Sequence, residues 1–351
     1  MMSIYYLIVG LVVLLTYQIV QELIVDEVFH VVQVQKYCSS SLEYNDKITT
    51  PPGLYIITWL WFKLLNCLYK LDCTIAFTRL TNVAYGMMMP LILKKLLQHQ
   101  DAAVEISMFP VSFFFHFLYY TDSGSTFWVL SSLLESRKKR YTRAALCSFI
   151  GIWYRQTNIV WMLFIMGHSV AMMQVNSKNC TLINYIQFAM NNMIIIIKKL
   201  WGFVMNVIMF TCFLYWNKGI VIGDKMNHTV AIHIPQIYYF SVFALFFSWD
   251  FQLFYRAMTR MIGPIDLVLI MAMVWTILEF TIEHPFLLAD NRHFSFYIWR
   301  WFFKGNLTMR LLVVPVYFLA LRGMFTKMSK YLMYLIKQDR PWTLSQSLDT
   351  H

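Results

Sequence analysis

Charge is scarce in this chain. Asp, Glu, Lys and Arg together make up 13% of its 351 residues, whereas hydrophobic residues make up 59%. A soluble domain carries about a quarter charged residues, so this composition, with a mean hydropathy of +0.54, excludes an ordinary soluble enzyme. We therefore predict an all-α polytopic membrane protein, a single integral membrane domain over 1–351 whose main solvent is lipid.

The sequence also lacks the features of a cleaved leader. Its first apolar segment, 4–25, has no basic region before it and no small-residue cleavage site after it, so we interpret it as a retained signal anchor. With this segment we expect about ten transmembrane helices. The other nine apolar stretches are 77–97, 104–121, 124–135, 143–154, 157–174, 200–217, 236–254, 264–282 and 308–325.

The formal net charge of +11 does not indicate a nucleic-acid partner. The basic residues stand in short runs between apolar segments, for example 137–140, and every second predicted span is followed by such residues. The positive-inside rule places them, the N-terminus and a tail at 327–351 in the cytoplasm. Arg155, Arg292 and Arg300 fall on the opposite side, where we consider them candidates for binding anions.

Two predicted helices do not cross the membrane. The segment 53–71 is apolar enough to span, but a span there would move every later basic run to the other side. We therefore expect it to lie as an interfacial helix on the lumenal surface, with a second surface helix near 27–37. Together they form a first lumenal loop over 26–76.

The six cysteines include no C-x-x-C pair and no metal-ligand spacing, so no metal site is predicted. Cys38, Cys67 and Cys73 lie in the predicted lumenal loop, where the environment is oxidising. The sequence does not determine which of them pair.

Several polar motifs interrupt the apolar pattern on the predicted lumenal side. They are Asp26-Glu27-Val28-Phe29-His30, Ile48-Thr49-Thr50-Pro51-Pro52-Gly53, Tyr119-Tyr120-Thr121-Asp122-Ser123-Gly124, Arg155-Gln156-Thr157-Asn158, Gly223-Asp224-Lys225 and His284-Pro285-Phe286-Leu287-Leu288-Ala289-Asp290-Asn291-Arg292-His293. Over about residues 5–301 this pattern resembles the dolichyl-phosphate-glucose α-1,2-glucosyltransferases, which add the last glucose to the lipid-linked oligosaccharide for N-glycosylation.

The resemblance implies a GT-C-like helical module in the endoplasmic reticulum membrane, with a lumenal active site and no cofactor. It implies a dolichyl-phosphate-glucose donor, a diglucosylated oligosaccharide acceptor on dolichyl diphosphate, and inversion at the anomeric carbon. An Asp at the start of the first loop would be the base, so Asp26 is the first candidate and Glu27 its competitor. The candidate substrate-binding residues are His30, Asp46, Asp122, Arg155, Asn158, His284, Asp290, Asn291, Arg292 and His293.

The sequence also departs from the family. After Arg310 it lacks the family's Glu-Pro-Arg-Tyr-type block, and Tyr44-Asn45 stands where a Trp is expected before Asp46. A non-catalytic relative that binds a membrane partner is therefore a second hypothesis. A polytopic transporter is a third, but it would bury ionisable residues near the midplane, whereas the polar motifs here gather at one membrane face. A membrane acyltransferase is less favoured, because no His-centred motif lies within a span.

Overall fold

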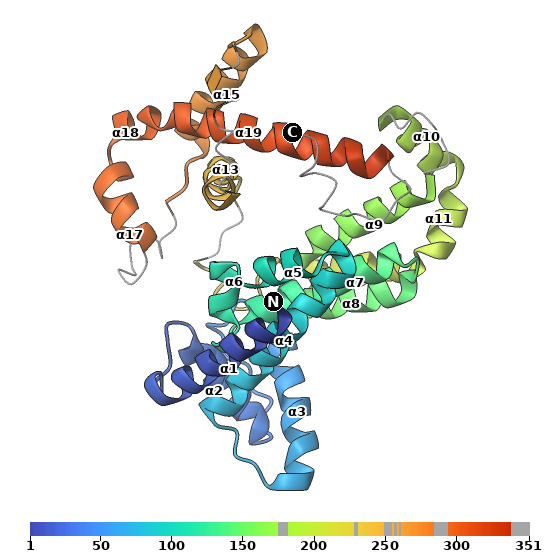
Figure 1. Cartoon of the computed structure of the whole chain (residues 1–351), viewed down its shortest axis with the longest axis vertical. Helices are drawn as coiled ribbons and strands as arrows, with labels where there is room; N and C mark the ends of the chain where they lie inside the picture. Colours follow the sequence, from blue (N-terminus) through green and yellow to red (C-terminus); the bar gives the residue numbers. More distant parts are fainter. Residues whose placement is uncertain are drawn as a thin grey trace. The chain divides into compact units, whose positions relative to one another are not determined.

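A computed structural model describes residues 1–174, 182–227, 231–248, 255, 258–259, 261–283 and 294–337. These residues form two compact units, one from 1–228 and one from 229–338. All regular structure in the described residues is helical, which confirms the predicted all-α class. Figure 1 shows the helices in chain order.

The helices of the first unit are α1 (Met2–Ile19), α2 (Glu27–Cys38), α3 (Gly53–Tyr69), α4 (Ile75–Leu97), α5 (Gln100–Ser107), α6 (Pro110–Phe115), α7 (Thr121–Arg137), α8 (Tyr141–Tyr154), α9 (Asn158–Gln174), α10 (Leu182–Asn191), α11 (Met193–Lys199) and α12 (Trp201–Asn217). Those of the second unit are α13 (Pro235–Ser248), α15 (Pro264–Phe280), α17 (Phe294–Ile298), the π-helix η1 (Trp299–Phe303), α18 (Leu307–Leu312) and α19 (Val314–Lys337).

Two helical stretches in the described residues are both long and apolar enough to cross a membrane. They are α1 and the 22 residues Leu307–Met328 of α18 and α19, and the bent pair α11 and α12 makes a third if it counts as one span. The other predicted spans coincide with shorter or less apolar helices, so the number of about ten stays a prediction.

The continuous helix expected over 104–121 does not form. Its sequence is divided between α5 and α6, and residues 116–120 follow without a continuing helix. Pro110 explains the break, because proline has no N–H for the helical ladder and is accepted only in the first turn of the new helix. The side-chain amide of Asn82 in α4 donates to the carbonyls of Leu118 and Tyr120, at 2.6 and 2.7 Å, and holds the segment after α6 in place.

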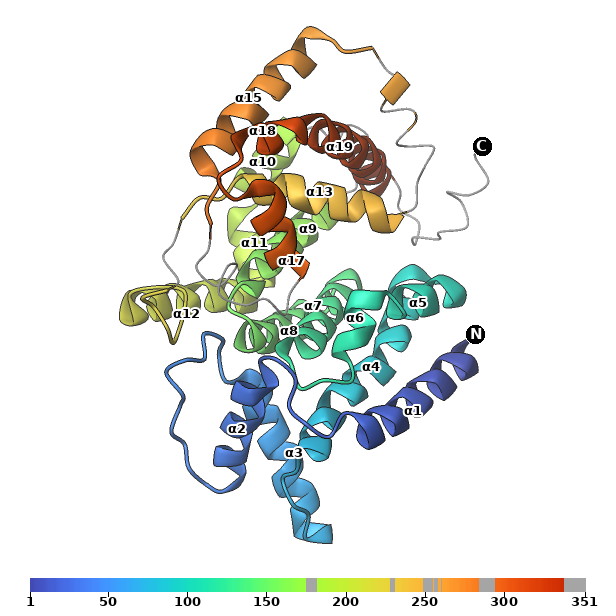
Figure 2. The ribbon, with the colours of Figure 1, turned by 90° about the vertical axis from the view of Figure 1, so that its left-hand side faces the viewer.

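The helices α2 and α3 form as expected near 27–37 and over 53–71. They lie side by side and pack on a core of buried tyrosines and aliphatic residues (Figure 2), which includes Val34, Tyr55 and Tyr154. Gly53 begins α3 against the end of α8, where a Cβ atom would overlap the backbone carbonyl of Trp153. Glycine therefore allows α3 to approach α8 closely.

The two faces of α3 differ in burial. Leu54, Tyr55 and Thr58 are fully buried, whereas Leu64 and Leu68 are 61% and 71% exposed. The exposed leucines are four residues apart and therefore lie on one face of the helix. Such an apolar face, left uncovered by the described chain, is typical of a helix that contacts lipid.

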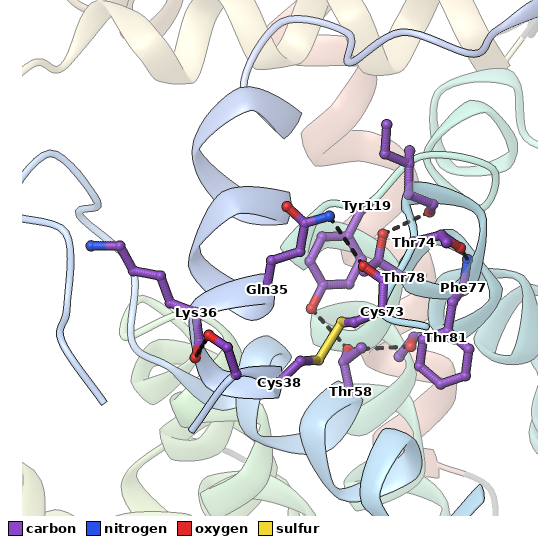
Figure 3. The surroundings of a disulfide bond; sticks show 12 residues. Gln35, Lys36, Cys38, Thr58, Cys73, Thr74, Phe77, Thr78, Thr81 and Tyr119 are labelled. Carbon is purple, nitrogen blue, oxygen red and sulfur yellow. Dashed lines mark hydrogen bonds between the residues drawn. A yellow bond between two sulfur atoms is a disulfide. The ribbon is translucent and has the colours of Figure 1, made fainter. Parts of the chain in front are cut away.

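A disulfide between Cys38 and Cys73 joins the end of α2 to the residues just before α4 (Figure 3). The Cα atoms are 6.4 Å apart. Next to it, Thr58 of α3 accepts a hydrogen bond from the Tyr119 hydroxyl and donates toward Thr81 of α4, at 2.8 and 3.2 Å. The pairing that the sequence left open is thus Cys38 with Cys73, and Cys67 is free and exposed.

In the second unit, α13, α15 and α19 pack around a separate apolar core that includes Met273, Ile277 and Phe318. Arg322 of α19 forms an ion pair with Asp266 of α15 at 3.3 Å. Arg300 lies in η1, and its exposed guanidinium stacks 5.6 Å above the Phe296 ring.

Candidate active site at the start of α2

Asp26 is the residue that precedes the first turn of α2. Its side chain is exposed and does not cap the helix, and no described residue forms a hydrogen bond or ion pair with its carboxylate. Its backbone N–H, by contrast, donates to the Tyr120 hydroxyl at 2.8 Å. The backbone is therefore held while the carboxylate points to solvent, as a base that accepts a proton from a substrate requires.

The neighbouring Glu27 has the opposite environment. Its side chain is fully buried and forms a paired, two-point contact with Arg79 of α4, at 2.9 and 2.6 Å. Its carboxylate also accepts the N–H of Tyr119, at 2.6 Å, and the N–H of Ile24, at 3.0 Å. All of its hydrogen-bonding capacity is thus directed into the protein.

His30 lies one helical turn after Asp26. Its Nδ1 shares a hydrogen bond of 2.6 Å with the Tyr55 hydroxyl of α3, and its ring packs edge-on against Tyr120. Burial, with a smaller contribution from the positive charge of Arg155, lowers the pKa of His30 to about 4. The imidazole is therefore neutral at pH 7.

Asp122 and Arg155 form an ion pair at 3.1 Å, and Arg155 also donates to the Thr121 hydroxyl at 2.9 Å. Asp122 lies in the first turn of α7, and Arg155 directly follows α8. Because α7 and α8 are joined by a short turn and pack against each other, these two ends meet. The Arg155 side chain is 42% exposed, so its guanidinium is accessible to an anion.

A second part of the first loop is tied to the segment after α12. The Asp46 carbonyl accepts the N–H of Asp224 at 2.8 Å, and a Cβ atom on Gly223 would overlap the Asp46 and Ile48 carbonyls. Gln156 donates from its side-chain amide to the Thr49 carbonyl at 3.0 Å. These contacts join the polar motifs 48–53, 155–158 and 223–225. The Asp46 side chain stays exposed.

The structure brings Asp26, His30, Asp122 and Arg155 together around Tyr120, and we call this group the Asp26 site. Its members influence one another electrostatically, since Arg155 acts on His30, and both Asp26 and Asp122 act on Tyr120. Asn158 is buried and donates to the Ser125 hydroxyl and the Gly151 carbonyl, both at 2.7 Å, and its predicted contact with substrate stays a prediction. These contacts make it a link between helices.

The predicted residues His284, Asp290, Asn291, Arg292 and His293 lie outside the described residues. Their roles stay predictions. In the part of the chain that the structure describes, no group of three or more His, Cys, Asp or Glu side chains has the arrangement of a metal site.

Sequence reasoning missed three side chains that hold this site: Tyr55, Arg79 and Tyr120. For Arg79 a signal was present, because an arginine within an apolar stretch is costly unless it has a specific partner. Tyr120 stands in the polar motif that also holds Asp122, but a tyrosine there was not distinguished from the other tyrosines of the chain, which number 21 in total and mostly suit an interface or a core.

The fold and this site define a helical membrane-associated protein whose candidate site has an exposed carboxylate, that of Asp26, and a partly exposed arginine, Arg155. The family follows from comparison of the sequence: the chain belongs to the DIE2/ALG10 family, whose profile matches residues 20–338. No solved structure matches the chain.

Curated relatives carry one name, Dol-P-Glc:Glc(2)Man(9)GlcNAc(2)-PP-Dol alpha-1,2-glucosyltransferase. The protein from Mus musculus is 30% identical, and the alignment covers 84% of this chain and 73% of the relative. The protein from Debaryomyces hansenii is 31% identical over 90% of this chain and 75% of the relative. The protein from Candida albicans is 32% identical, over 84% and 72%.

Proposed function

We propose that this chain transfers glucose from dolichyl-phosphate-glucose to the diglucosylated oligosaccharide on dolichyl diphosphate, forming the terminal α-1,2 linkage of the N-glycan precursor. The observation that carries the proposal is the family match over 20–338, with relatives about 30% identical that are named for this reaction. The exposed carboxylate of Asp26 and the partly exposed guanidinium of Arg155 are consistent with it.

In the proposed reaction, Asp26 accepts the proton of the acceptor hydroxyl while that oxygen attacks the anomeric carbon of glucose. The bond between this carbon and the phosphate oxygen breaks, and its electron pair leaves with dolichyl phosphate. Attack from the face opposite the leaving group inverts the configuration. Asp26 is the preferred base because Glu27 is buried and saturated by hydrogen bonds.

The leaving phosphate requires positive charge, because negative charge grows on it as the glycosidic bond breaks. Arg292 is the sequence's first candidate for this role, in the polar block with His284, Asp290, Asn291 and His293. Of the two other candidates, Arg155 and Arg300, we prefer Arg155, since its guanidinium is partly exposed and lies in the Asp26 site. Asp46, Asp122 and His30 are proposed to contact sugar hydroxyls. Asn158 was predicted to do the same, but its burial and its bonds to Ser125 and Gly151 favour a structural role.

The site is proposed to face the lumen of the endoplasmic reticulum, with α2 and α3 at the membrane surface. The Cys38–Cys73 disulfide supports this placement, because structural disulfides persist in oxidising compartments. It also links residues before and after α3, which are therefore on the same side of the membrane. The exposed leucine face of α3 supports contact with lipid.

The decisive experiment analyses lipid-linked oligosaccharides in cells that lack this chain. We expect the species one glucose short of complete to accumulate, and the wild-type chain to restore the complete species. An unchanged profile would reject the proposed reaction. Restoration by an Asp26→Asn variant would exclude Asp26 as the base, whereas purified wild-type protein without transfer activity on the defined donor and acceptor would favour the non-catalytic relative.

A further inference from the structure

Arg79 is bonded more extensively than its position in α4 requires. Its guanidinium donates four hydrogen bonds, two to the Glu27 carboxylate and one each to the carbonyls of Val20, at 2.5 Å, and Glu22, at 3.0 Å. One buried side chain thus connects α4 to the end of α1, to the connecting segment and to α2. A guanidinium suits this role because its donors diverge in a fixed plane.

Glu27 completes the connection. Its oxygens accept from Arg79, from Ile24 three residues before it, and from Tyr119 in the segment after α6. The Tyr120 hydroxyl adds a bond to the Ile24 carbonyl, at 3.1 Å, while accepting the Asp26 N–H. Each of these hydrogen bonds involves Ile24, Asp26 or Glu27, so all of them hold the backbone or side chains of the turn that contains Asp26.

The backbone at this point is strained. Val25 has φ = 50°, in the left-handed region, which a β-branched residue rarely occupies. Such a conformation persists only where the surroundings determine it, and strained residues of this kind are found at functional sites. Here the bonds to Ile24 and Asp26 lie on both sides of Val25, and the residue that the strain orients is Asp26.

We infer that Arg79 and Glu27 are positioning residues, which hold the turn 24–27 so that the Asp26 carboxylate meets the acceptor hydroxyl. This inference rests on the proposed transferase function. Arg79 is buried and its guanidinium is bonded to Glu27 and to backbone carbonyls, and Glu27 in turn holds the backbone N–H groups of Ile24 and Tyr119. Stability alone is a weak explanation for the pair, because two buried charges lose much of their mutual attraction to desolvation.

The test measures transfer to the lipid-linked acceptor by purified full-length protein carrying Arg79→Lys, Glu27→Gln or both. Each single variant is expected to lower kcat at least about tenfold with KM for donor and acceptor nearly unchanged, because a small displacement of a catalytic group costs mainly turnover. Since the two residues act as one unit, the double variant should be no slower than the slower single variant.

Tyr120→Phe tests the same idea without disturbing the buried charges. It removes only the hydroxyl that contacts Ile24 and Asp26, so the protein should fold and still lose turnover. Arg137→Gln is the matched control. Arg137 also donates to a carbonyl of α4, that of Leu96 at 2.8 Å, but at the end of α4 away from Arg79. Its loss should leave kcat per folded molecule unchanged.

Folded protein is quantified in each preparation by the amplitude of its cooperative thermal unfolding transition. The inference is overturned if kcat per folded molecule is at the wild-type level in Arg79→Lys and in Tyr120→Phe, or if the losses of the two charge variants multiply. A wild-type protein without any transfer would reject the proposed function and this inference together.

Discussion

At the scale of single residues, two adjacent carboxylates have opposite environments. Asp26 is exposed and unbonded at its carboxylate among the described residues, whereas Glu27 is fully buried against Arg79. Successive residues at a helix start point in different directions around the axis, by about 100°. The Asp26-Glu27 pair can therefore present one carboxylate to a substrate while the other binds Arg79 inside the protein.

Asp26→Asn is expected to lower glucosyl transfer by about 10²–10⁴-fold, the usual effect of losing a general base. The amide keeps the shape of the side chain, and the Tyr120 contact to the backbone N–H is preserved, so folding and donor binding should hardly change. Turnover is measured at saturating donor and acceptor. Wild-type turnover in this variant would exclude Asp26 as the base.

His30 should make stability depend on pH. Its pKa is about 4 in the folded protein and near 6.5 when unfolded, so between these values the unfolded chain binds the extra proton. Stability is thus complete above about pH 6.5 and falls as the pH is lowered toward 4, by about 1–2 kcal/mol at pH 5. Thermal unfolding at pH 7 and pH 5 measures this.

His30→Gln is the comparison for that experiment. Because glutamine does not titrate, the variant should lose less of its thermal stability between pH 7 and pH 5 than the wild type does. Equal losses in the two proteins would show that His30 is not buried in its neutral form.

At the scale of helices, the pair α2 and α3 carries the site on one side and exposes apolar side chains on the other. Its geometry depends on Gly53, which allows contact with α8, and on the Cys38–Cys73 disulfide, which closes the segment 38–73. Gly53 keeps the start of α3 close to α8, and the disulfide holds the end of α2 near the start of α4. Tyr55 of α3 is hydrogen-bonded to His30 of α2.

Replacing both Cys38 and Cys73 by serine is expected to lower stability by about 2–4 kcal/mol, the typical effect of losing a disulfide. Cys67→Ser is the matched control, because Cys67 lies in the last turn of α3, in the segment that the disulfide closes, but is itself free and exposed. Thermal unfolding of the two variants compares them. A loss of stability in Cys67→Ser equal to that of the double variant would contradict the observed pairing.

The first loop is expected to lie wholly on one side of the membrane. Single cysteines near Ser40 and near Asp72, placed in a chain whose free cysteines are replaced, should react with a membrane-impermeant reagent from the lumenal side in sealed microsomes. The reason is the interfacial position of α3 between them. Labelling of the two positions from opposite sides would mean that α3 crosses the membrane.

At the scale of the whole molecule, the chain forms two units, and the described parts of the Asp26 site all belong to the first. The polar block 284–293 belongs to the second unit in sequence and lies outside the described residues. The proposed reaction needs a base and a cation for the leaving phosphate. Asp26 remains the proposed base, and Arg292 remains the sequence's first candidate for the phosphate contact.

Substitutions of Arg292 test its proposed contact with the donor phosphate. A guanidinium binds two phosphate oxygens at once, and the interaction strengthens as charge develops on the leaving group, so its loss should affect kcat. Arg292→Lys, which keeps the charge but loses the planar fork, should lower turnover, and Arg292→Ala should lower it further. If both variants transfer glucose at the wild-type rate with saturating donor, Arg155 or Arg300 becomes the next candidate.

The amino-acid sequence by itself determined the helical class, the positions of α2 and α3, and the family. These follow from composition, from local patterns of apolar residues and from short motifs, all of which a sequence displays directly. The helix break within 104–121 was also encoded locally, at Pro110, although the apolar composition around it favoured a continuous span.

Only the tertiary structure decided which carboxylate is exposed, which cysteines pair, and that Arg79 holds the start of α2. Glu27 and Arg79 are 52 residues apart, Cys38 and Cys73 are 35 apart, and Asp26 and Tyr120 are 94 apart. Such contacts depend on how helices pack, and packing places a side chain by the sum of many long-range interactions. The local sequence does not determine these long-range interactions, so the partners of a buried charge can be identified only in the folded chain.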